Sequence, residues 1–417
     1  MHTYKKIFLL FLILHLIGSV FYIVHSGDTF RFWDEEDYYT ISSNIIEKGK
    51  FSRYGEVNNA CRPPGYPFFL AAIMMFSKKV IVIKLIQLIL YYLSAFLVYK
   101  ITYIIRRDKK ISLLSVFLFL IYPSVLYITN TLYPQVVYMI LFLLLLYILL
   151  LKSERIYMYI LLGIINALLV FVIPIHILFL PFILFFILKE IQKSKILKSG
   201  IFIVVTIAVL FPWTWRNYNI FDRFVFIATN GGQNLLCGNS PNTTPNSGTT
   251  TDISEYIDED VIQQLDDAER DKYYQDKALT FIKQEPLYYL GLYFRKFLNY
   301  FNYQNTLNTK EQSTKINPAT KLKFIVIAIT WFPVLFLSIS GFLIKKIRKN
   351  FYNIYILLLF VCSGLFYAVF FTRIRFRSPF VPLLIIIAAQ TIFFLYNVIK
   401  DRYRIGSGIN NTISTTL

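Results

Sequence analysis

The sequence predicts an all-α membrane protein whose chain crosses the bilayer about ten times. Of its 417 residues, 56% are hydrophobic and only 16% are charged. Soluble domains usually carry about 25% charged residues, so this composition excludes an ordinary soluble protein. Long uncharged runs recur along the chain, and short clusters of Lys and Arg separate them. An uncharged run of about 20 residues is long enough for one transmembrane helix.

Eight runs are each expected to form one span. They are residues 7–24, 81–105, 111–128, 133–151, 200–215, 324–344, 351–371 and 379–399. A further uncharged run from Tyr157 to Leu188 is too long for a single span, and Pro174 and Pro181 interrupt it. Basic residues flank this run on both sides, so the positive-inside rule predicts two short crossings within it. The chain then crosses ten times, and both termini lie in the cytoplasm.

The first run follows Lys5 and Lys6 and lacks a small-residue cleavage pattern, so we expect an uncleaved first span. The formal net charge is +19. Because the basic residues lie in short clusters between spans, they indicate cytoplasmic loops and do not support nucleic-acid binding. Of the 24 acids, seven lie in residues 28–56 and thirteen in residues 222–311. These two regions are therefore expected outside the cell, at the external face of the cell membrane.

Four divisions of the chain follow from this pattern. They are an N-terminal transmembrane module (1–216) that includes a first external catalytic loop (25–80), an external loop region (217–321), C-terminal transmembrane helices (322–405) and a disordered tail (406–417). Within the external parts, residues 64–76 are apolar but too short to span, so we expect them to dip into the outer leaflet.

The larger external region has three expected parts. Residues 229–251 are rich in Gly, Asn, Ser and Pro, which predicts an irregular loop. Residues 254–284 predict an acidic surface helix that ends before Pro286. Residues 287–301 form an apolar pattern that carries Arg295 and Lys296, which predicts a helix at the membrane interface.

The first external loop contains the strongest candidate for a functional site. It reads RFWDEEDYYTISSNIIEKGKFSRYGEVNNACRPPGYPFFL over residues 31–70 and places four acids, Asp34 to Asp37, directly after the first span. Asp34 is expected to cap a short helix that continues to about residue 45, with Lys48 and Gly49 marking its end. The carboxylates then lie at the boundary between water and lipid.

Several arginines are expected at the same boundary, against the usual bias of basic residues toward the cytoplasm. Arg375 and Arg377 lie in the short external turn TRIRFRSP, Arg62 lies in the turn CRPPGYP, and Arg216 ends PWTWRN. Charges at membrane depth are costly unless they meet an anion, and the arginine fork suits phosphate oxygens. The alternative is that these arginines reach lipid headgroups.

Carboxylates beside arginines fit the transfer of a sugar from a polyprenyl-phosphate carrier to an acceptor hydroxyl. A carboxylate takes the proton from the attacking hydroxyl. The leaving phosphate has a second pKa near 6, so it can depart as a dianion when arginines neutralise it. We predict Asp34 as the base, because Glu35 points about 100 degrees away on a helix. Glu35 is expected to orient Asp34 or to contact the acceptor or a metal.

No cofactor is evident. The sequence contains no Cys or His spacing typical of a metal site, while a divalent metal held by carboxylates stays an open alternative. Cys61 and Cys237 both fall in predicted external loops, where they either pair or remain free thiols. The segment GGQNLLCGN is not a nucleotide phosphate loop, because no Lys-Ser or Lys-Thr follows it.

Four segments in order resemble one family. They are WDEEDYYTISSNIIEKGKF with RPPGYPFFLA, PWTWRNYNIF with FVFIATNGGQNLLCGNSP, ALTFIKQEPLYYLGLYFRK, and RIRFRSPFVPLLIIIAA. Together they resemble the GT-C membrane glycosyltransferases of the protein-mannosyltransferase-like group, similar to lipid A aminoarabinose transferases and dolichyl-phosphate-mannose protein mannosyltransferases. The resemblance implies an inverting transferase that uses a polyprenyl-phosphate sugar. Its catalytic acidic pair corresponds to Asp34 and Glu35, and its basic residue before the Pro-Pro turn to Arg62.

Two other classes of function are alternatives. A transporter of lipid-linked glycans would place ionisable residues near the bilayer midplane, whereas the acids here gather at one surface. A polymerase or ligase that uses a diphosphate-linked glycan would explain the large external loop but not the acidic pair. The sequence leaves the sugar open, and it leaves the acceptor open among glycans, lipids and proteins.

Overall fold

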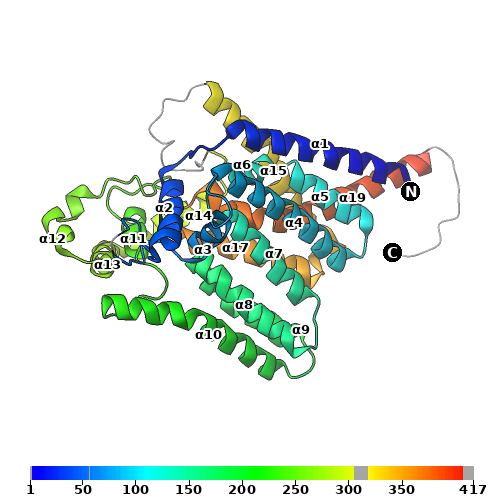
Figure 1. Ribbon diagram of the computed structural model, residues 1–417. Helices are drawn as coiled ribbons and strands as arrows, with labels where there is room; N and C mark the ends of the chain where they lie inside the picture. Colours follow the sequence, from blue (N-terminus) through cyan, green and yellow to red (C-terminus); the bar gives the residue numbers. More distant parts are fainter. Residues whose placement is uncertain (1, 56, 305–317, 407–417) are drawn as a thin grey trace.

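The computed structural model describes residues 2–55, 57–304 and 318–406 of the chain. All regular elements in these ranges are helices, which confirms the predicted all-α class. They form an elongated bundle with a group of shorter helices at one end (Figure 1). The start of α1 and the end of α19 lie together at the other end of the bundle (Figure 1).

The bundle consists of long apolar helices and their shorter neighbours. They are α1 (His2–Ser26), α4 (Val80–Arg106), α5 (Lys109–Leu120), α6 (Pro123–Thr129), α7 (Gln135–Leu150), α8 (Ile156–Val172), α9 (Leu180–Glu190), α10 (Lys195–Phe221), α15 (Pro318–Gly341), α17 (Phe351–Ala368) and α19 (Val381–Gly406). In the described ranges, six helices are long and apolar enough to cross a membrane, and α5 with α6, bent by 60°, would make a seventh. The ten crossings stay a prediction, because several of these helices are shorter than a full span.

The uncharged run that was expected to cross twice forms two helices that run in opposite directions. α8 ends at Val172, a 3-10 turn η1 (Pro174–Phe179) follows, and α9 continues the chain to Glu190. An ion pair joins Glu190 at the end of α9 to Lys152, just before α8 begins. The chain therefore returns to the end of the bundle from which it started.

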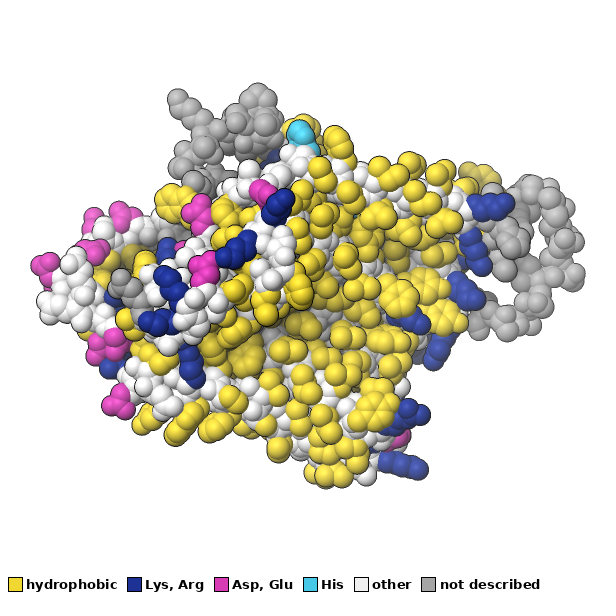
Figure 2. All heavy atoms as spheres, in the orientation of Figure 1, with side chains coloured by type: hydrophobic (Ala, Val, Ile, Leu, Met, Phe, Trp, Pro, Cys, Tyr) yellow, Lys and Arg dark blue, Asp and Glu magenta, His cyan; other side chains and the backbone are white. Residues whose placement is uncertain are grey.

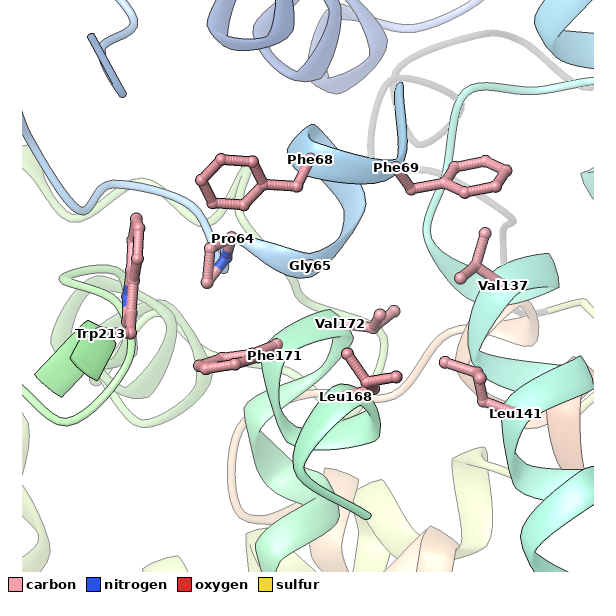
Figure 3. Close-up of a pocket in the computed structure, with 10 residues that line it drawn as sticks. All are labelled: Pro64, Gly65, Phe68, Phe69, Val137, Leu141, Leu168, Phe171, Val172 and Trp213. Atoms are coloured by element: carbon pink, nitrogen blue, oxygen red, sulfur yellow. The ribbon is translucent and has the colours of Figure 1, made fainter. Parts of the chain in front are cut away.

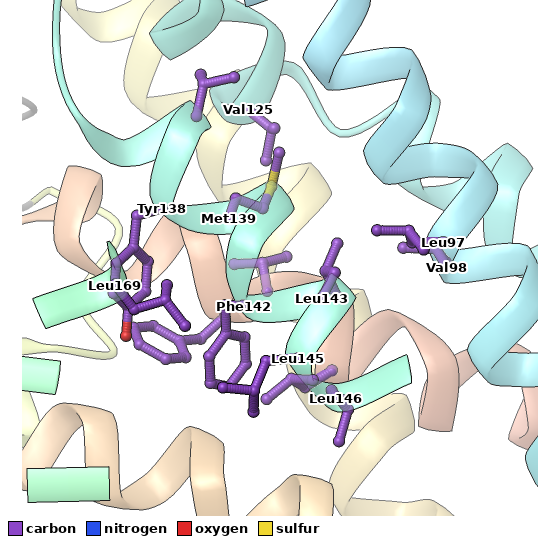
Figure 4. Close-up of a cluster of buried hydrophobic side chains, with 14 of the residues drawn as sticks. Leu97, Val98, Val125, Tyr138, Met139, Phe142, Leu143, Leu145, Leu146 and Leu169 are labelled. Carbon is purple, nitrogen blue, oxygen red and sulfur yellow. The ribbon is translucent and has the colours of Figure 1, made fainter. Parts of the chain in front are cut away.

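Close helix contacts and large side chains both contribute to the core. Gly163 on α8 lies against α10, where an added Cβ would come within 2.8 Å of the Val205 Cβ atom. Small residues at such contacts let helix backbones approach each other, which is how helices commonly associate in membranes. On the other side of the bundle, α7 packs on α4, with side chains such as Met139 and Phe142 fully enclosed between neighbouring helices (Figure 4).

The outer surface divides into three bands. On the face that Figure 2 shows, hydrophobic side chains cover the middle of the bundle, Asp and Glu gather with some Lys and Arg at the end with the short helices, and Lys and Arg without this acidic excess gather at the opposite end. We call these two ends the acidic end and the basic end. The short helices of the acidic end are α2 (Trp33–Lys48), α3 (Gly65–Met74), α11 (Gly231–Gly238), α12 (Glu259–Gln264), α13 (Asp267–Gln284) and α14 (Pro286–Asn299).

The predicted N-cap of the first external helix was wrong. α2 begins at Trp33, and its N-cap position is Phe32, which makes no side-chain capping bond. Asp34 is therefore inside the first helical turn instead of capping it. The predicted end at Lys48 and Gly49 is confirmed, with Gly49 at a φ of 64° in the left-handed region.

The segment 229–251 was expected to be irregular, but part of it forms the helix α11. The reason is its contact with α13: the amide of Gly232 donates to Asp271 Oδ1 at 2.6 Å, and a Cβ on Gly232 would lie 1.8 Å from the Asp271 carbonyl oxygen. Only glycine permits this approach. The acidic helix expected over 254–284 is divided, because Asp266 caps a new helix start at α13.

The predicted divisions at 216 and 321 fall within α10 and α15. The predicted tail from 406 onward lies almost wholly outside the described residues.

Candidate active site

A polar cavity of about 510 Å³ opens at the acidic end. Its walls come from α2, the turn that contains Arg62, the segment before α7, the end of α8, helices α11 and α13, and the chain before and within the short helix α18 (Ile374–Arg377). Segments that are more than 300 residues apart in sequence thus surround one space.

Asp34 lies in the wall of this cavity and receives hydrogen bonds from three separate parts of the chain. Its Oδ1 accepts from Arg62 Nη2 at 2.7 Å, and its Oδ2 accepts from Arg375 Nη1 at 3.3 Å and from the Tyr133 hydroxyl at 3.3 Å. The Asp34 side chain remains 29% exposed. A carboxylate and two guanidinium groups therefore meet at one accessible point.

The arginines determine the charge of Asp34. Burial alone would raise the pKa of its carboxyl group, but Arg62 and Arg375 outweigh this effect and hold the pKa at about 2. Asp34 is thus a carboxylate at neutral pH. While it is paired with both arginines, it is also a weak proton acceptor.

A second aspartate holds Arg62 in place. Asp37 Oδ2 accepts from Arg62 Nη2 at 2.7 Å, and its Oδ1 pairs with Arg53 Nε at 2.8 Å. The Arg62 guanidinium also lies over the Tyr38 ring at 5.3 Å. Asp37 is one helical turn from Asp34, so the two carboxylates share a face of α2 and hold one arginine between them.

Glu35, in contrast, points into the protein and does not line the cavity. Its side chain is fully buried, and Oε2 accepts from the backbone amide of Arg31 at 3.3 Å. Burial raises the pKa of Glu35 to about 7. The predicted divergence of Asp34 and Glu35 is therefore observed, while the expected contact of Glu35 with an acceptor or a metal does not fit its position.

Two of the arginines expected to bind phosphate lie outside the cavity lining. Arg377 is fully buried, donates to the Tyr300 carbonyl oxygen at 2.7 Å and lies over the Trp331 ring at 3.8 Å. Arg216 donates to the Asn59 carbonyl oxygen at 2.8 Å and stacks on Trp213. Both bind backbone carbonyl groups of neighbouring segments. Of the four expected arginines, only Arg62 and Arg375 line the cavity.

Within the described residues, no group of three or more His, Cys, Asp or Glu side chains is close enough to hold a metal ion. Asp34 and Asp37 are instead engaged by arginines. Cys61 lines the cavity and Cys237 is buried, and both are free thiols instead of a disulfide pair.

An apolar cavity of about 430 Å³ lies next to the polar one (Figure 3). Its lining includes Phe69 from α3, Leu141 from α7 and Trp213 from α10, and Val172 lines both cavities. Phe68, one of its lining residues, is 46% exposed, so the lining of the apolar cavity continues to the outer surface. In the turn that carries Arg62, Pro63 lines the polar cavity and Pro64 lines the apolar one.

Among the cavity residues that sequence reasoning missed, three bind Asp34 or belong to its ion-pair network: Asp37, Arg53 and Tyr133. Asp37 could have been found, because it follows Asp34 by three residues on a predicted helix. Arg53 lies in a loop, and Tyr133 lies at the start of a predicted span, so neither has a local pattern that points to the site.

The fold agrees with that of known membrane glycosyltransferases. No protein-family model matches the chain, and no curated protein sequence matches it significantly. Among solved structures, the apo oligosaccharyltransferase of Archaeoglobus fulgidus matches with a TM-score of 0.55 and 13% identity over 99% of this chain and 54% of that one. AglB of the same organism, in complex with an inhibitory peptide and a dolichol-phosphate, matches with a TM-score of 0.51 and 13% identity over 96% and 52%.

ArnT from Cupriavidus metallidurans, bound to undecaprenyl phosphate, has a TM-score of 0.47 and 10% identity over 96% of this chain and 63% of that one. The chain spans about half the length of the oligosaccharyltransferases that it matches. It thus has the GT-C fold predicted from the sequence, that of a polytopic membrane protein.

Proposed function

We propose that this protein is an inverting glycosyltransferase that moves a sugar from a polyprenyl-phosphate carrier to an acceptor hydroxyl at the external face of the cell membrane. The observation that carries the proposal is the meeting of Asp34, Arg62 and Arg375 in a polar cavity that adjoins an apolar, laterally open one. Such a pair of cavities suits a ligand with a charged head and a long hydrocarbon tail.

Arg62 and Arg375 are the groups that we assign to the donor phosphate. Both line the cavity, and both now bind Asp34. Arginine forms charge-assisted, often bidentate bonds with phosphate oxygens. An arriving phosphate would compete with Asp34 for these two guanidinium groups.

This competition would convert Asp34 into a better base. A phosphate beside Asp34 adds negative charge and withdraws the arginine bonds that stabilise its carboxylate, and both effects raise its pKa. Asp34 then takes the proton from the acceptor hydroxyl as the hydroxyl oxygen bonds to the anomeric carbon. The bond from that carbon to the phosphate oxygen breaks, and its electron pair leaves with the carrier phosphate.

The carrier tail is assigned to the apolar cavity. The cavity lies between α3, α7, α8 and α10 and reaches the hydrophobic surface at Phe68 (Figure 3). An isoprenoid chain could therefore remain in the bilayer while its phosphate reaches Arg62. The acceptor would enter from the opposite wall, which α11 and α13 form with polar side chains such as Gln233 and Asn234.

Substitution of the proposed base tests the chemistry. Asp34→Asn keeps the shape of the side chain but removes a proton acceptor, so we expect transfer to fall by at least about 100-fold. The control is Glu36→Gln, which changes an exposed carboxylate two residues away. Transfer is measured with purified protein and a panel of polyprenyl-phosphate sugars. Full transfer by a folded Asp34→Asn protein would remove Asp34 from this role.

Donor binding is tested separately from chemistry. Arg375→Gln should weaken donor binding by about tenfold or more, because a charge-assisted hydrogen bond contributes about 1.5 to 3 kcal/mol. Arg216→Gln is the control, since Arg216 is outside the cavity and should affect stability instead of donor affinity. Equal donor affinity in the wild type and Arg375→Gln would contradict the assignment.

A diphosphate-linked donor is the second candidate. Two further arginines, Arg53 and Arg270, line the same cavity and could meet a second phosphate. Monophosphate and diphosphate carriers of the same sugar, compared in the binding assay, distinguish the two donors.

A further inference from the structure

A second polar cavity, of about 420 Å³, lies at the basic end of the bundle, opposite the candidate active site. It is enclosed by the end of α4, the start of α5, the short helix α16 (Lys345–Arg348) and the later part of α19. Arg106 and Lys346 bring positive charge to its wall, and Asn397 brings an amide. Nothing in the proposed transfer reaction uses these residues.

Arg106 has a buried donor atom without a hydrogen-bond partner. That atom is its Nε, and the charge of Asp108 is the acidic charge that acts on the Arg106 guanidinium. Asp108 lines the same cavity, but its Oδ1 accepts from the amides of Lys110 and Ile111 and caps α5. Arg106 and Lys346 together with Asp108 leave a net charge of about +1 in the lining, before the surrounding basic clusters are considered.

A buried donor without a partner is costly, and a guanidinium has five N–H groups to satisfy. An anion in the cavity would supply an acceptor for the unpaired Nε–H and further acceptors for the guanidinium. Phosphate is the anion that an arginine fork fits well. Basic pockets between transmembrane helices are known sites for phospholipid headgroups.

The position of the cavity favours a lipid over a soluble anion. Phe393 and Phe394 from α19 form part of its wall, and the Phe394 side chain is 39% exposed on the hydrophobic surface of the bundle. Lys and Arg crowd this end of the molecule (Figure 2). A headgroup phosphate could therefore reach Arg106 while its acyl chains pack beside Phe394.

We propose that this cavity binds the phosphate headgroup of an anionic phospholipid in the leaflet at the basic end, with Arg106 as the main contact and Lys346 as a second. By the positive-inside rule this leaflet is the cytoplasmic one. The site is separate from the donor cavity, so the proposal does not depend on glycosyl transfer.

The test measures binding of a fluorescent phosphatidylglycerol to the full-length protein in phosphatidylcholine nanodiscs. Arg106→Gln should lower its affinity about tenfold, while Arg107→Gln should leave it nearly unchanged. Arg107 is the matched control because it is adjacent in sequence, carries the same charge and is exposed. Arg106→Lys, which keeps the charge, should restore part of the affinity and addresses the case in which Arg106→Gln fails to fold.

Three outcomes would overturn the proposal. Equal displacement of the probe by phosphatidylcholine and phosphatidylglycerol would mean that no anion is recognised. An equal loss in Arg106→Gln and Arg107→Gln would mean that diffuse surface charge attracts the lipid. Displacement by inorganic phosphate as effective as that by unlabelled phosphatidylglycerol would identify a soluble-anion site instead of a lipid site.

Discussion

Replacement of Glu35 by glutamine tests whether this residue supports the fold or takes part in transfer. Glu35 follows the proposed base directly, but its side chain is fully buried and outside the cavity lining. Burial raises the pKa of its carboxyl group from 4.5 to about 7. The folded protein therefore holds a proton on Glu35 at pH values where the unfolded chain has released it.

The sign and size of the effect follow from this difference. Below about pH 4.5 both states are protonated, so Glu35 causes no penalty. Stability then falls as pH rises from about 4.5 to 7, and above that range the loss is constant. One pKa unit corresponds to about 1.4 kcal/mol, so the full loss is about 3 kcal/mol. Glu35→Gln removes the titration and should keep the acceptor for the Arg31 amide.

We expect Glu35→Gln to match the wild type in thermal stability near pH 5 and to exceed it near pH 8, with transfer activity retained. Glu36→Gln is the matched control, because Glu36 is exposed on the same helix and should show no such pH-dependent gain. The assay is thermal unfolding of purified protein across this pH range. Parallel curves for the Glu35→Gln and wild-type proteins, or loss of transfer by a stable variant, would refute this reasoning.

Two further predictions concern contacts that connect the parts of the acidic end. Lys296 is fully buried, and its Nζ donates to carbonyl oxygens of Gly238 and Phe370 at 2.9 Å each. Lys296→Met should lower the free energy of unfolding by about 3 kcal/mol, because it leaves these oxygens unpaired. Arg295 is the exposed neighbour of Lys296, so Arg295→Met should have little effect in the same thermal unfolding assay. Gly232→Ala should loosen α11 from α13 and increase hydrogen exchange in both helices, because its Cβ would overlap the Asp271 carbonyl oxygen. Gly231→Ala should not, because its Cβ would have no atom nearer than 4.0 Å.

Helix α14 shows what tertiary contacts add to a local pattern. The sequence predicted a helix over residues 287–301, and the structure has α14 (Pro286–Asn299) there. Its place at the membrane interface stays a prediction, and the pattern did not indicate an inward role for Lys296. In the structure Lys296 turns inward and joins α14 to α11 and to the chain after α17. A lysine on an apolar helix has the same local pattern in both cases, and only the partner carbonyl groups decide between them.

The amino-acid sequence by itself determined the membrane class and most of the apolar helices, because hydrophobic run length and charge clusters report directly on burial in lipid. It indicated the first acidic loop as the candidate site. It also indicated that Asp34 and Glu35 diverge, since adjacent helical residues must. Only the tertiary structure decided which arginines meet Asp34. Arg62 and Arg375 are separated from each other by most of the chain, and Arg375 and Arg377 differ only in the neighbours that enclose them. Such contacts depend on how distant helices pack, which no local pattern encodes.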